Sequence, residues 1–118
     1  LDSITAHKRK LADVYFSRLP TWVEKPVRRK DEYDVFHIFP IRYRERDRLR
    51  AFLREKGIMT EIHYPIPPHR QDAMREVLKG DYPIADELHA TELSVPISYG
   101  HTVEDVRAVC DAFLEFKR

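Results

Sequence analysis

Apolar side chains recur about every 3.6 residues in the first part of the chain, which predicts an amphipathic helix over residues 1–19. Pro20 ends this helix because proline cannot continue the hydrogen-bond pattern of a helix. The same period returns in residues 45–56, where acidic residues lie in the first turn and Gly57 follows the last turn. Glycine accepts the left-handed conformation that often closes a helix, so we expect a second helix there.

A different pattern predicts strands in three segments. Residues 33–43 are β-branched or aromatic on both faces, which is typical of a covered strand, although Pro40 restricts part of it to an edge or a bulge. Residues 58–63 alternate with the period of two expected of a strand. Residues 93–97 form a brief apolar run, which predicts a third strand.

Three further helices are predicted in the second half of the chain. Residues 71–79 favour a short helix that a glycine stops, and Pro83 opens another that reaches about residue 92. Thr102 and Asp105 have the spacing of a capping box at the start of the last helix. The predicted buried stripe of that helix consists of Val103, Val106, Cys110, Phe113 and Phe116.

The order of these elements, α-β-α-β-α-α-β-α, is typical of a small α/β (α+β) layer domain. We expect a three-stranded, mainly antiparallel sheet, with the third strand between the first two, flanked by about five helices. A chain of 118 residues has room for a single domain. Within it, we expect residues 1–19 to form a linking helix and residues 33–118 to form the α/β core.

Composition narrows the classes of function. Of the 118 residues, 42% are hydrophobic and 35% are charged, and no apolar run approaches the roughly 18 residues of a membrane-spanning helix. The net charge of +1 is too balanced to require nucleic acid or an anionic membrane as a partner. Cys110 is the only cysteine, and no signal-peptide pattern is seen, so we expect a cytoplasmic protein. The chain starts in helical register without a methionine, which favours a piece of a longer protein.

The densest chemistry lies in residues 60–71, where His63, Tyr64 and His69 stand among three prolines. Prolines fix the backbone, so this loop loses little entropy when it presents polar side chains to a ligand. The two histidines could also share a metal ion, but no cysteine or acidic ligand joins them in a pattern. A third interpretation is that His63 only ends a strand and bonds a loop carbonyl.

Other candidate groups have structural interpretations beside the functional ones. Residues 42–56 hold six arginines and a lysine against three acids, which could meet phosphates, yet interleaved charges on a helix favour a solvated, ion-paired face. His37 lies in an apolar segment and is predicted to be a core histidine, and Cys110 is predicted to be inert packing. The chain has neither a glycine-rich phosphate loop nor a nucleophile beside a general base.

Three segments together carry a resemblance to a known family. They read GIMTEIHYPIPPHRQ, YPIADELHATELSVPIS and HTVEDVRAV, and each is weak alone, but their order and distances are specific. With YDVFHIFPIR before them, they resemble the C-terminal domain of the DegT/DnrJ/EryC1/StrS sugar aminotransferases over essentially the whole chain.

This resemblance implies pyridoxal phosphate (PLP) chemistry in a longer, homodimeric enzyme. The family moves an amino group, usually from glutamate, to a keto sugar attached to a nucleotide. Such chemistry needs a lysine that bonds the cofactor and an acid near the pyridine nitrogen. In the family both lie in the large N-terminal domain, and nothing in this chain matches their motifs. We therefore expect PLP in the full-length enzyme and none on this chain, with no catalytic residue here.

The resemblance also assigns the site residues. His63 and Tyr64 match positions on the substrate side of the family's pocket, and His69 is a weaker candidate for substrate binding. The alternative is a stand-alone small α/β module that uses the basic helix of residues 42–54 to bind an anionic ligand or nucleic acid. If the large domain is missing, we expect helix 1–19 to keep an uncovered apolar stripe through which copies associate. That stripe consists of Ile4, Leu11, Val14 and Tyr15.

Overall fold

The computed structural model describes residues 1–118 as four α-helices, a two-stranded antiparallel sheet and two short 3-10 helices. In chain order the elements are α1 (Asp2–Arg18), β1 (Phe39–Arg42), α2 (Arg46–Glu55), η1 (Pro68–Arg70), η2 (Asp72–Met74), α3 (Pro83–Thr91), β2 (Glu92–Val95) and α4 (Val103–Glu115). The α/β class and the antiparallel sheet are confirmed, whereas the strand expected over residues 58–63 and the α-helix expected over residues 71–79 are absent.

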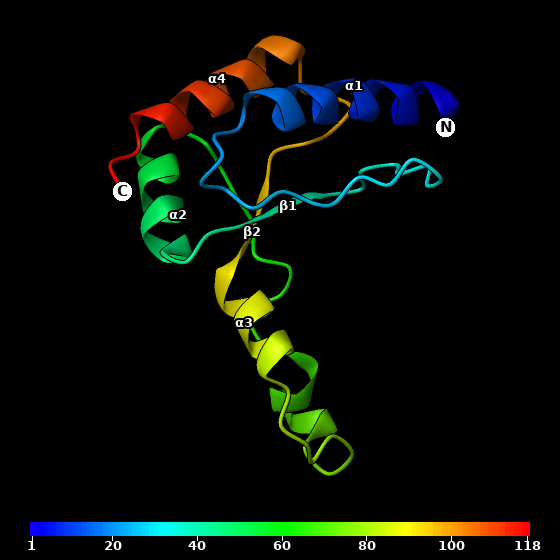
Figure 1. The fold of residues 1–118 in the computed structure, drawn as a ribbon, viewed down its shortest axis with the longest axis vertical. Helices are drawn as coiled ribbons and strands as arrows, with labels where there is room; N and C mark the ends of the chain where they lie inside the picture. The colour runs from blue at the N-terminus through cyan, green and yellow to red at the C-terminus, as the bar shows by residue number, and fades with distance from the viewer.

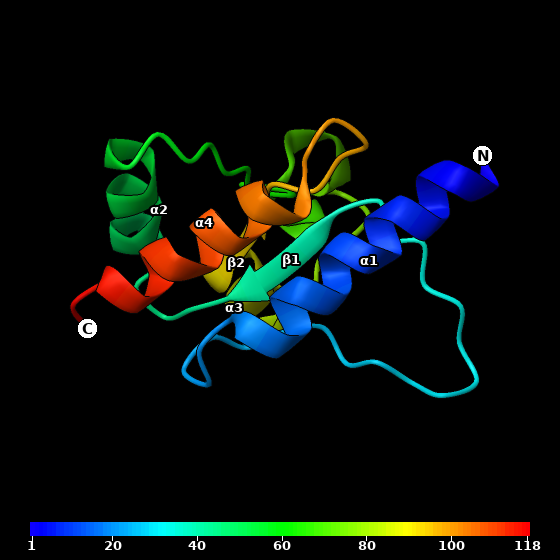
Figure 2. The ribbon, with the colours of Figure 1, turned by 90° about the horizontal axis from the view of Figure 1, so that it is seen from above.

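The elements form a layered body and a projecting arm. Helices α1 and α4 lie side by side over the sheet, and α2 lies beside the end of α4 (Figures 1 and 2). We call residues 65–91 the arm, because α3 and the two 3-10 helices extend away from the sheet along the longest axis of the molecule (Figure 1). The remaining residues form the body. None of the helices combines the length and the apolar character that a membrane crossing requires.

The core lies between the sheet and the pair α1 and α4. Alternation along β1 and β2 places Phe39, Ile41, Leu93 and Val95 on the buried face. Tyr15 of α1 stacks on Phe39 at 4.9 Å, and its hydroxyl donates to the Pro96 carbonyl at 2.6 Å. Burial raises the pKa of Tyr15, so this phenol stays protonated and keeps its hydrogen bond.

The helix ends follow the sequence signals. Gly57 has a φ of +77°, and Pro83 occupies the first turn of α3. The Thr102 side chain accepts from the Asp105 N–H at 3.1 Å, while the Asp105 carboxylate accepts from the Thr102 N–H at 2.8 Å, which is the predicted capping box. The predicted stripe of α4 is also confirmed, and burial raises the pKa of the Cys110 thiol to about 11.

The first strand is shorter than the predicted 33–43. Phe36 has a φ of +48°, a left-handed conformation that interrupts an extended segment, and β1 begins only at Phe39. This turn also leaves His37 exposed, so the prediction of a core histidine was wrong. The His37 carbonyl accepts a hydrogen bond from Lys8 Nζ at 2.7 Å.

Pro40 lies inside β1 although proline has no N–H group for a ladder. It stands opposite Ser94, and Ser94 exchanges its backbone hydrogen bonds with Glu61 on its other side, at 2.8 and 3.1 Å. The Pro40–Ser94 pair is therefore one of the non-hydrogen-bonded pairs of the antiparallel ladder. The N–H that proline lacks would point away from β2, so the two strands pair normally around it.

The outer edge of β1 carries a single bridge. Glu24 and Arg42 exchange backbone hydrogen bonds of 3.1 and 2.9 Å. The next pair of this kind, two residues further along each segment, would join Pro26 to Pro40, and neither residue has an N–H. Pairing stops there.

The predicted strand over residues 58–63 is likewise reduced to one bridge, between Glu61 and Ser94. In one direction the next pair would use Pro96, which has no N–H. In the other direction the His63 N–H donates to the Glu92 carboxylate at 2.8 Å, and the Glu92 carbonyl accepts from Arg46 Nη1 at 2.9 Å. Side chains thus take the backbone groups that a longer strand would need, although β2 does lie between the other two segments as predicted.

Two helical predictions also need correction. Residues 71–79 contain only the 3-10 helix η2, because the segment buries no apolar face and a short helix without tertiary packing is marginal. The stripe of α1 was expected to be uncovered, but Leu11 and Tyr15 are fully buried in the core of this same chain. Only Ile4, near the start of α1, is exposed, at 41%.

Candidate functional site

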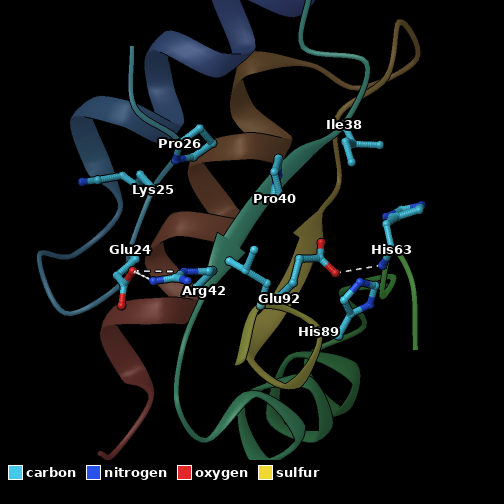
Figure 3. A pocket seen from close by; sticks show the side chains of 10 residues that line it. Glu24, Lys25, Pro26, Ile38, Pro40, Arg42, His63, His89 and Glu92 are labelled. Atoms are coloured by element: carbon cyan, nitrogen blue, oxygen red, sulfur yellow. Dashed lines mark hydrogen bonds and ion pairs between the residues drawn. The ribbon is translucent and has the colours of Figure 1, made fainter. Parts of the chain in front are cut away.

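A cleft of about 420 Å³ opens on the face of the sheet that points away from α1 and α4. The sheet forms its floor, the base of the arm forms one wall, and the segment after α1 forms another (Figure 3). Its polar lining consists of Glu24, Lys25, Arg42, His63, His89 and Glu92.

Strand alternation explains how this lining arises. Phe39 and Ile41 point into the core, so Pro40 and Arg42 point into the cleft. Glu92 pairs with Arg42 in the β1–β2 register and shares its face. The proline positions that end pairing at the outer edge also contribute apolar walls to the cleft.

The cations at one end of the cleft are already engaged. Arg42 Nε donates to Glu24 Oε2 at 3.0 Å, and Arg42 Nη2 contacts the same oxygen (Figure 3). This hydrogen bond raises the pKa of Arg42, which is charged in any case. Lys25 Nζ donates to the Leu19 carbonyl at 3.2 Å. A ligand would meet these groups in fixed positions.

His63 is anchored from two sides at the opposite end. Its backbone N–H is held by Glu92 Oε2, as described above, and its Nδ1 lies 2.9 Å from Ser94 Oγ. The Ser94 hydroxyl donates to Glu92 Oε1 at 2.6 Å, and Ser94 is only 5% exposed. A ring held by a buried hydroxyl has one defined orientation.

The structure brings together only part of the predicted set. Tyr64 is 67% exposed, packs edge-on against His63 at 5.5 Å between ring centroids, and does not line the cleft. Its carbonyl accepts from His89 Nδ1, which joins the arm to the body.

His69 lies within the arm and away from the cleft lining. Its Nε2 donates to Asp86 Oδ1 at 3.0 Å, and its ring packs against Tyr82 at 5.0 Å. Arg70 also binds Asp86, and this guanidinium, with a smaller contribution from His69, lowers the pKa of that carboxyl. These contacts connect the 3-10 helix η1 to α3, so they hold the arm together.

Sequence reasoning missed Glu92, Ser94 and His89. A partial signal was present, because the period of two in ELSV places Glu92 and Ser94 opposite the apolar Leu93 and Val95. No sequence pattern indicated that His89 lines the cleft, because its position there depends on the direction in which the arm extends from the sheet.

The basic segment 42–56 is largely ion-paired, as its interleaved charges indicated. Arg46 pairs with Asp47, Arg48 with Glu45, and Lys56 with Glu115. No group of three or more histidine, cysteine, aspartate or glutamate side chains is arranged to hold a metal ion.

The residues of this chain do not fit the attachment of PLP. Among the lysines only Lys25 lines the cleft, and its ammonium is bound to the Leu19 carbonyl. The acids of the cleft, Glu24 and Glu92, are engaged by Arg42 and by His63 and Ser94 respectively. Neither the lysine nor the acids of this cleft are therefore free for the two roles that PLP chemistry requires.

Comparison with known proteins finds the family that the sequence motifs resemble. Residues 1–114 match the DegT/DnrJ/EryC1/StrS aminotransferase family. The chain is 34% identical over 113 residues to the dTDP-3-amino-3,6-dideoxy-alpha-D-galactopyranose transaminase of Aneurinibacillus thermoaerophilus, covering 95% of this chain and 31% of that protein. It is 36% identical over 101 residues to the dTDP-3-amino-3,4,6-trideoxy-alpha-D-glucose transaminase of Streptomyces venezuelae, covering 82% and 27%.

Solved structures show the same fold. The crystal structure of Streptomyces venezuelae DesV in complex with a ketimine intermediate superposes with a TM-score of 0.91 at 33% identity, over 97% of this chain and 32% of that one. Spr1654 from Streptococcus pneumoniae, in its PLP form, gives a TM-score of 0.81 at 20% identity, over 95% and 31%, which shows the fold alone. The chain thus spans about a third of the length of these proteins and matches about their C-terminal third.

Proposed function

The chain belongs to the DegT/DnrJ/EryC1/StrS aminotransferase family, a PLP-dependent family, and on this premise we propose that it is the small C-terminal domain of a nucleotide-sugar aminotransferase. The enzyme would transfer an amino group from glutamate to a keto sugar linked to a nucleotide, in polysaccharide or secondary-metabolite sugar biosynthesis. We propose that it works in the cytoplasm as a homodimer.

The cleft beside His63 is the observation that carries this proposal for the chain's own residues. Its volume of about 420 Å³ falls within the roughly 300–1,000 Å³ typical of small-molecule sites. Its lining combines six polar side chains, each fixed by a hydrogen bond within the chain, with four apolar ones, which suits a polar ligand such as a sugar. The apolar residues are Pro26, Ile38, Pro40 and Leu88.

Each side chain has a role that its contacts allow. His63 would hydrogen-bond the sugar, because its ring is anchored at the mouth of the cleft and its Nε2 has no partner in the chain. Tyr64 packs on that ring and would cover the sugar from the solvent side. His69 would act indirectly, by holding the arm that carries His89. The PLP, its lysine and its acid would come from the large domain.

The test uses the complete enzyme that contains this chain and separates its two half-reactions. We expect His63→Ala and Tyr64→Ala to lower turnover of the nucleotide sugar while the half-reaction with glutamate stays near its original rate. His37→Ala, an exposed histidine outside the cleft, is the matched control. Equal losses in both half-reactions would contradict a sugar-binding role.

A second measurement concerns the chain alone. After incubation with PLP and then borohydride, the chain should not acquire a stoichiometric adduct at one of its seven lysines. Partial modification spread over several lysines would not contradict this expectation. A single fully modified lysine, seen by peptide mass analysis, would overturn the assignment of cofactor binding to the large domain.

A further inference from the structure

Glu92 and Ser94 form a chain of hydrogen bonds behind His63, and neither was a predicted site residue. We infer that these two are positioning residues: they hold His63 as the Nδ1–H tautomer, so that the ring presents Nε2 to a ligand as a hydrogen-bond acceptor. This inference deepens the proposed function and rests on it only for the identity of the ligand.

The two contacts of the Ser94 hydroxyl determine which nitrogen of His63 carries the hydrogen. An ionised carboxylate has no hydrogen and can only accept, so in the contact of 2.6 Å the Ser94 hydroxyl donates to Glu92 Oε1. A hydroxyl has a single hydrogen, so Ser94 Oγ must accept in its other contact, at 2.9 Å from His63 Nδ1. The hydrogen of the neutral imidazole is therefore on Nδ1, and Nε2 carries a lone pair.

Both Glu92 oxygens accept hydrogen bonds, and this fixes the direction of the hydrogen bond between Ser94 and Glu92. Oε1 accepts from Ser94, and Oε2 accepts from the His63 backbone N–H at 2.8 Å. The carboxylate thus holds the backbone and, through Ser94, the ring of the same histidine. Because Ser94 is 5% exposed, water does not compete readily for its hydroxyl.

The lone pair on His63 Nε2 determines which ligand groups this ring can bind. A neutral His63 with a free Nε2 lone pair accepts a hydrogen bond, so it selects a group with an O–H or N–H to donate. A sugar hydroxyl fits, whereas a phosphate or carboxylate oxygen, which only accepts, does not. His63 would therefore face a hydroxyl of the sugar rather than the anionic diphosphate of the nucleotide.

The other histidines supply internal standards. His89 Nδ1 contacts the Tyr64 carbonyl, which can only accept, so His89 is also an Nδ1–H tautomer. His7 Nε2 lies 2.7 Å from the His101 carbonyl and His69 Nε2 lies 3.0 Å from the Asp86 carboxylate, so both are Nε2–H tautomers. One spectrum of this chain thus contains references of both kinds.

The test is nitrogen-15 NMR of the imidazole rings in the 118-residue chain at about pH 8, above the ordinary histidine pKa of about 6.5. We expect His63 and His89 as Nδ1–H, and His7 and His69 as Nε2–H. In Glu92→Gln the amide oxygen must face the His63 N–H, so the amide NH₂ faces Ser94 and donates to it. The freed hydroxyl then donates to Nδ1, and His63 should switch to Nε2–H while His89 does not.

Glu55→Gln, at an exposed position outside this network, is the matched control and should leave all tautomers unchanged. Ser94→Ala removes the acceptor altogether and should also lower the Nδ1–H population of His63. Unchanged signals of His7 and His69 in each variant establish that the fold is intact. An Nε2–H signal for His63 in the original chain, or an Nδ1–H signal retained in Glu92→Gln, would overturn the inference.

Kinetic measurements on the complete enzyme distinguish the failure of the positioning role from the failure of the proposed function. There Glu92→Gln should raise KM for the nucleotide sugar by about threefold to tenfold, the value of one hydrogen bond, without changing the glutamate half-reaction. If the tautomers are as stated but neither Glu92→Gln nor His63→Ala alters sugar turnover, the proposed function fails and the positioning network stands. If sugar turnover falls in His63→Ala but the tautomer is Nε2–H, the network fails alone.

Discussion

The body and the arm are built in different ways. The body buries a cluster of 19 apolar residues between the sheet, α1, α2 and α4, whereas neither α3 nor the 3-10 helices of the arm bury any residue. Apolar side chains of the arm such as Val77 and Ile84 are 69% and 74% exposed. The body has the core of an independent domain, and the arm does not.

The arm is held instead by polar contacts near its base and by rigid backbone. Arg46, only 11% exposed, donates to the carbonyls of His89 and Glu92 at the end of α3. Within the arm, Asp86 joins η1 to α3, and prolines restrict the backbone before η1 and at its first residue. Regions with few buried contacts open at a lower free energy than a core does, so the two regions should respond differently to mutation.

The largest effect is expected in the body. Phe113 of α4 is fully buried, so Phe113→Ala should lower the free energy of unfolding by about 3–5 kcal/mol, through lost burial and the cavity left behind. Its sequence neighbour Leu114 is 65% exposed, and Leu114→Ala should change stability by less than about 0.5 kcal/mol. Urea titration followed by circular dichroism measures both. Similar losses in the two variants would remove the basis of the comparison.

A smaller effect is expected where the arm meets the body. Arg46→Ala leaves two carbonyls at the end of α3 without their donor, at a cost of about 1–3 kcal/mol. The change should appear as faster hydrogen exchange in residues 83–91, with the amides of α4 unaffected. Arg50→Ala, on the same helix and without an ion pair, is the control. Faster exchange throughout the body would instead make Arg46 a part of the global fold.

The smallest effect concerns pH and acts on the arm through Asp86. Hydrogen bonding to Arg70 lowers the folded-state pKa of Asp86 below its ordinary value of 3.8. A lowered pKa means that the ionised carboxylate stabilises the arm above pH 3.8, and that this contribution is lost as the pH falls through the lower value. Hydrogen exchange in the arm should therefore accelerate below that pH, and Asp86→Asn should remove the dependence.

In the body, Asp105 should give a similar pH dependence at the start of α4. Hydrogen bonds from the Thr102 backbone and side chain lower the pKa of Asp105, so α4 should lose its cap in the same acidic range. Asp105→Asn should affect the start of α4 and leave the arm unchanged. If either variant altered both regions, they would form one cooperative unit.

The same division explains how much of the fold the sequence could predict. Helices α2 and α4 were predicted because their signals are local: a cap, a terminal glycine and a periodic apolar face. The strand predicted over residues 58–63 could not be ruled out from the sequence, because its loss depends on Pro96 and on side chains of Glu92 and Arg46 that are remote in sequence. In the arm, a helix was predicted over 71–79 by propensity, but no partner surface is present to support it.

The site was predictable to a similar extent. His63 and the stiff proline segment stood out in the sequence, and His63 does line the cleft. His69 was the weaker candidate, and η1 directs it to Asp86 within the arm. The residues that orient His63 lie 29 and 31 positions away, so only the strand register could associate them with it.

The prolines that limit the sheet also bear on whether another molecule can add a strand to it. An open sheet edge presents free N–H and C=O groups to which a strand of another molecule can add, and such addition is a route to aggregation. Here Pro26 and Pro40 face the outer side of β1, and Pro96 together with the Glu92 and Arg46 side chains closes the outer side of β2. A two-stranded sheet with both edges closed in the folded chain offers little template for edge-to-edge addition of a second copy.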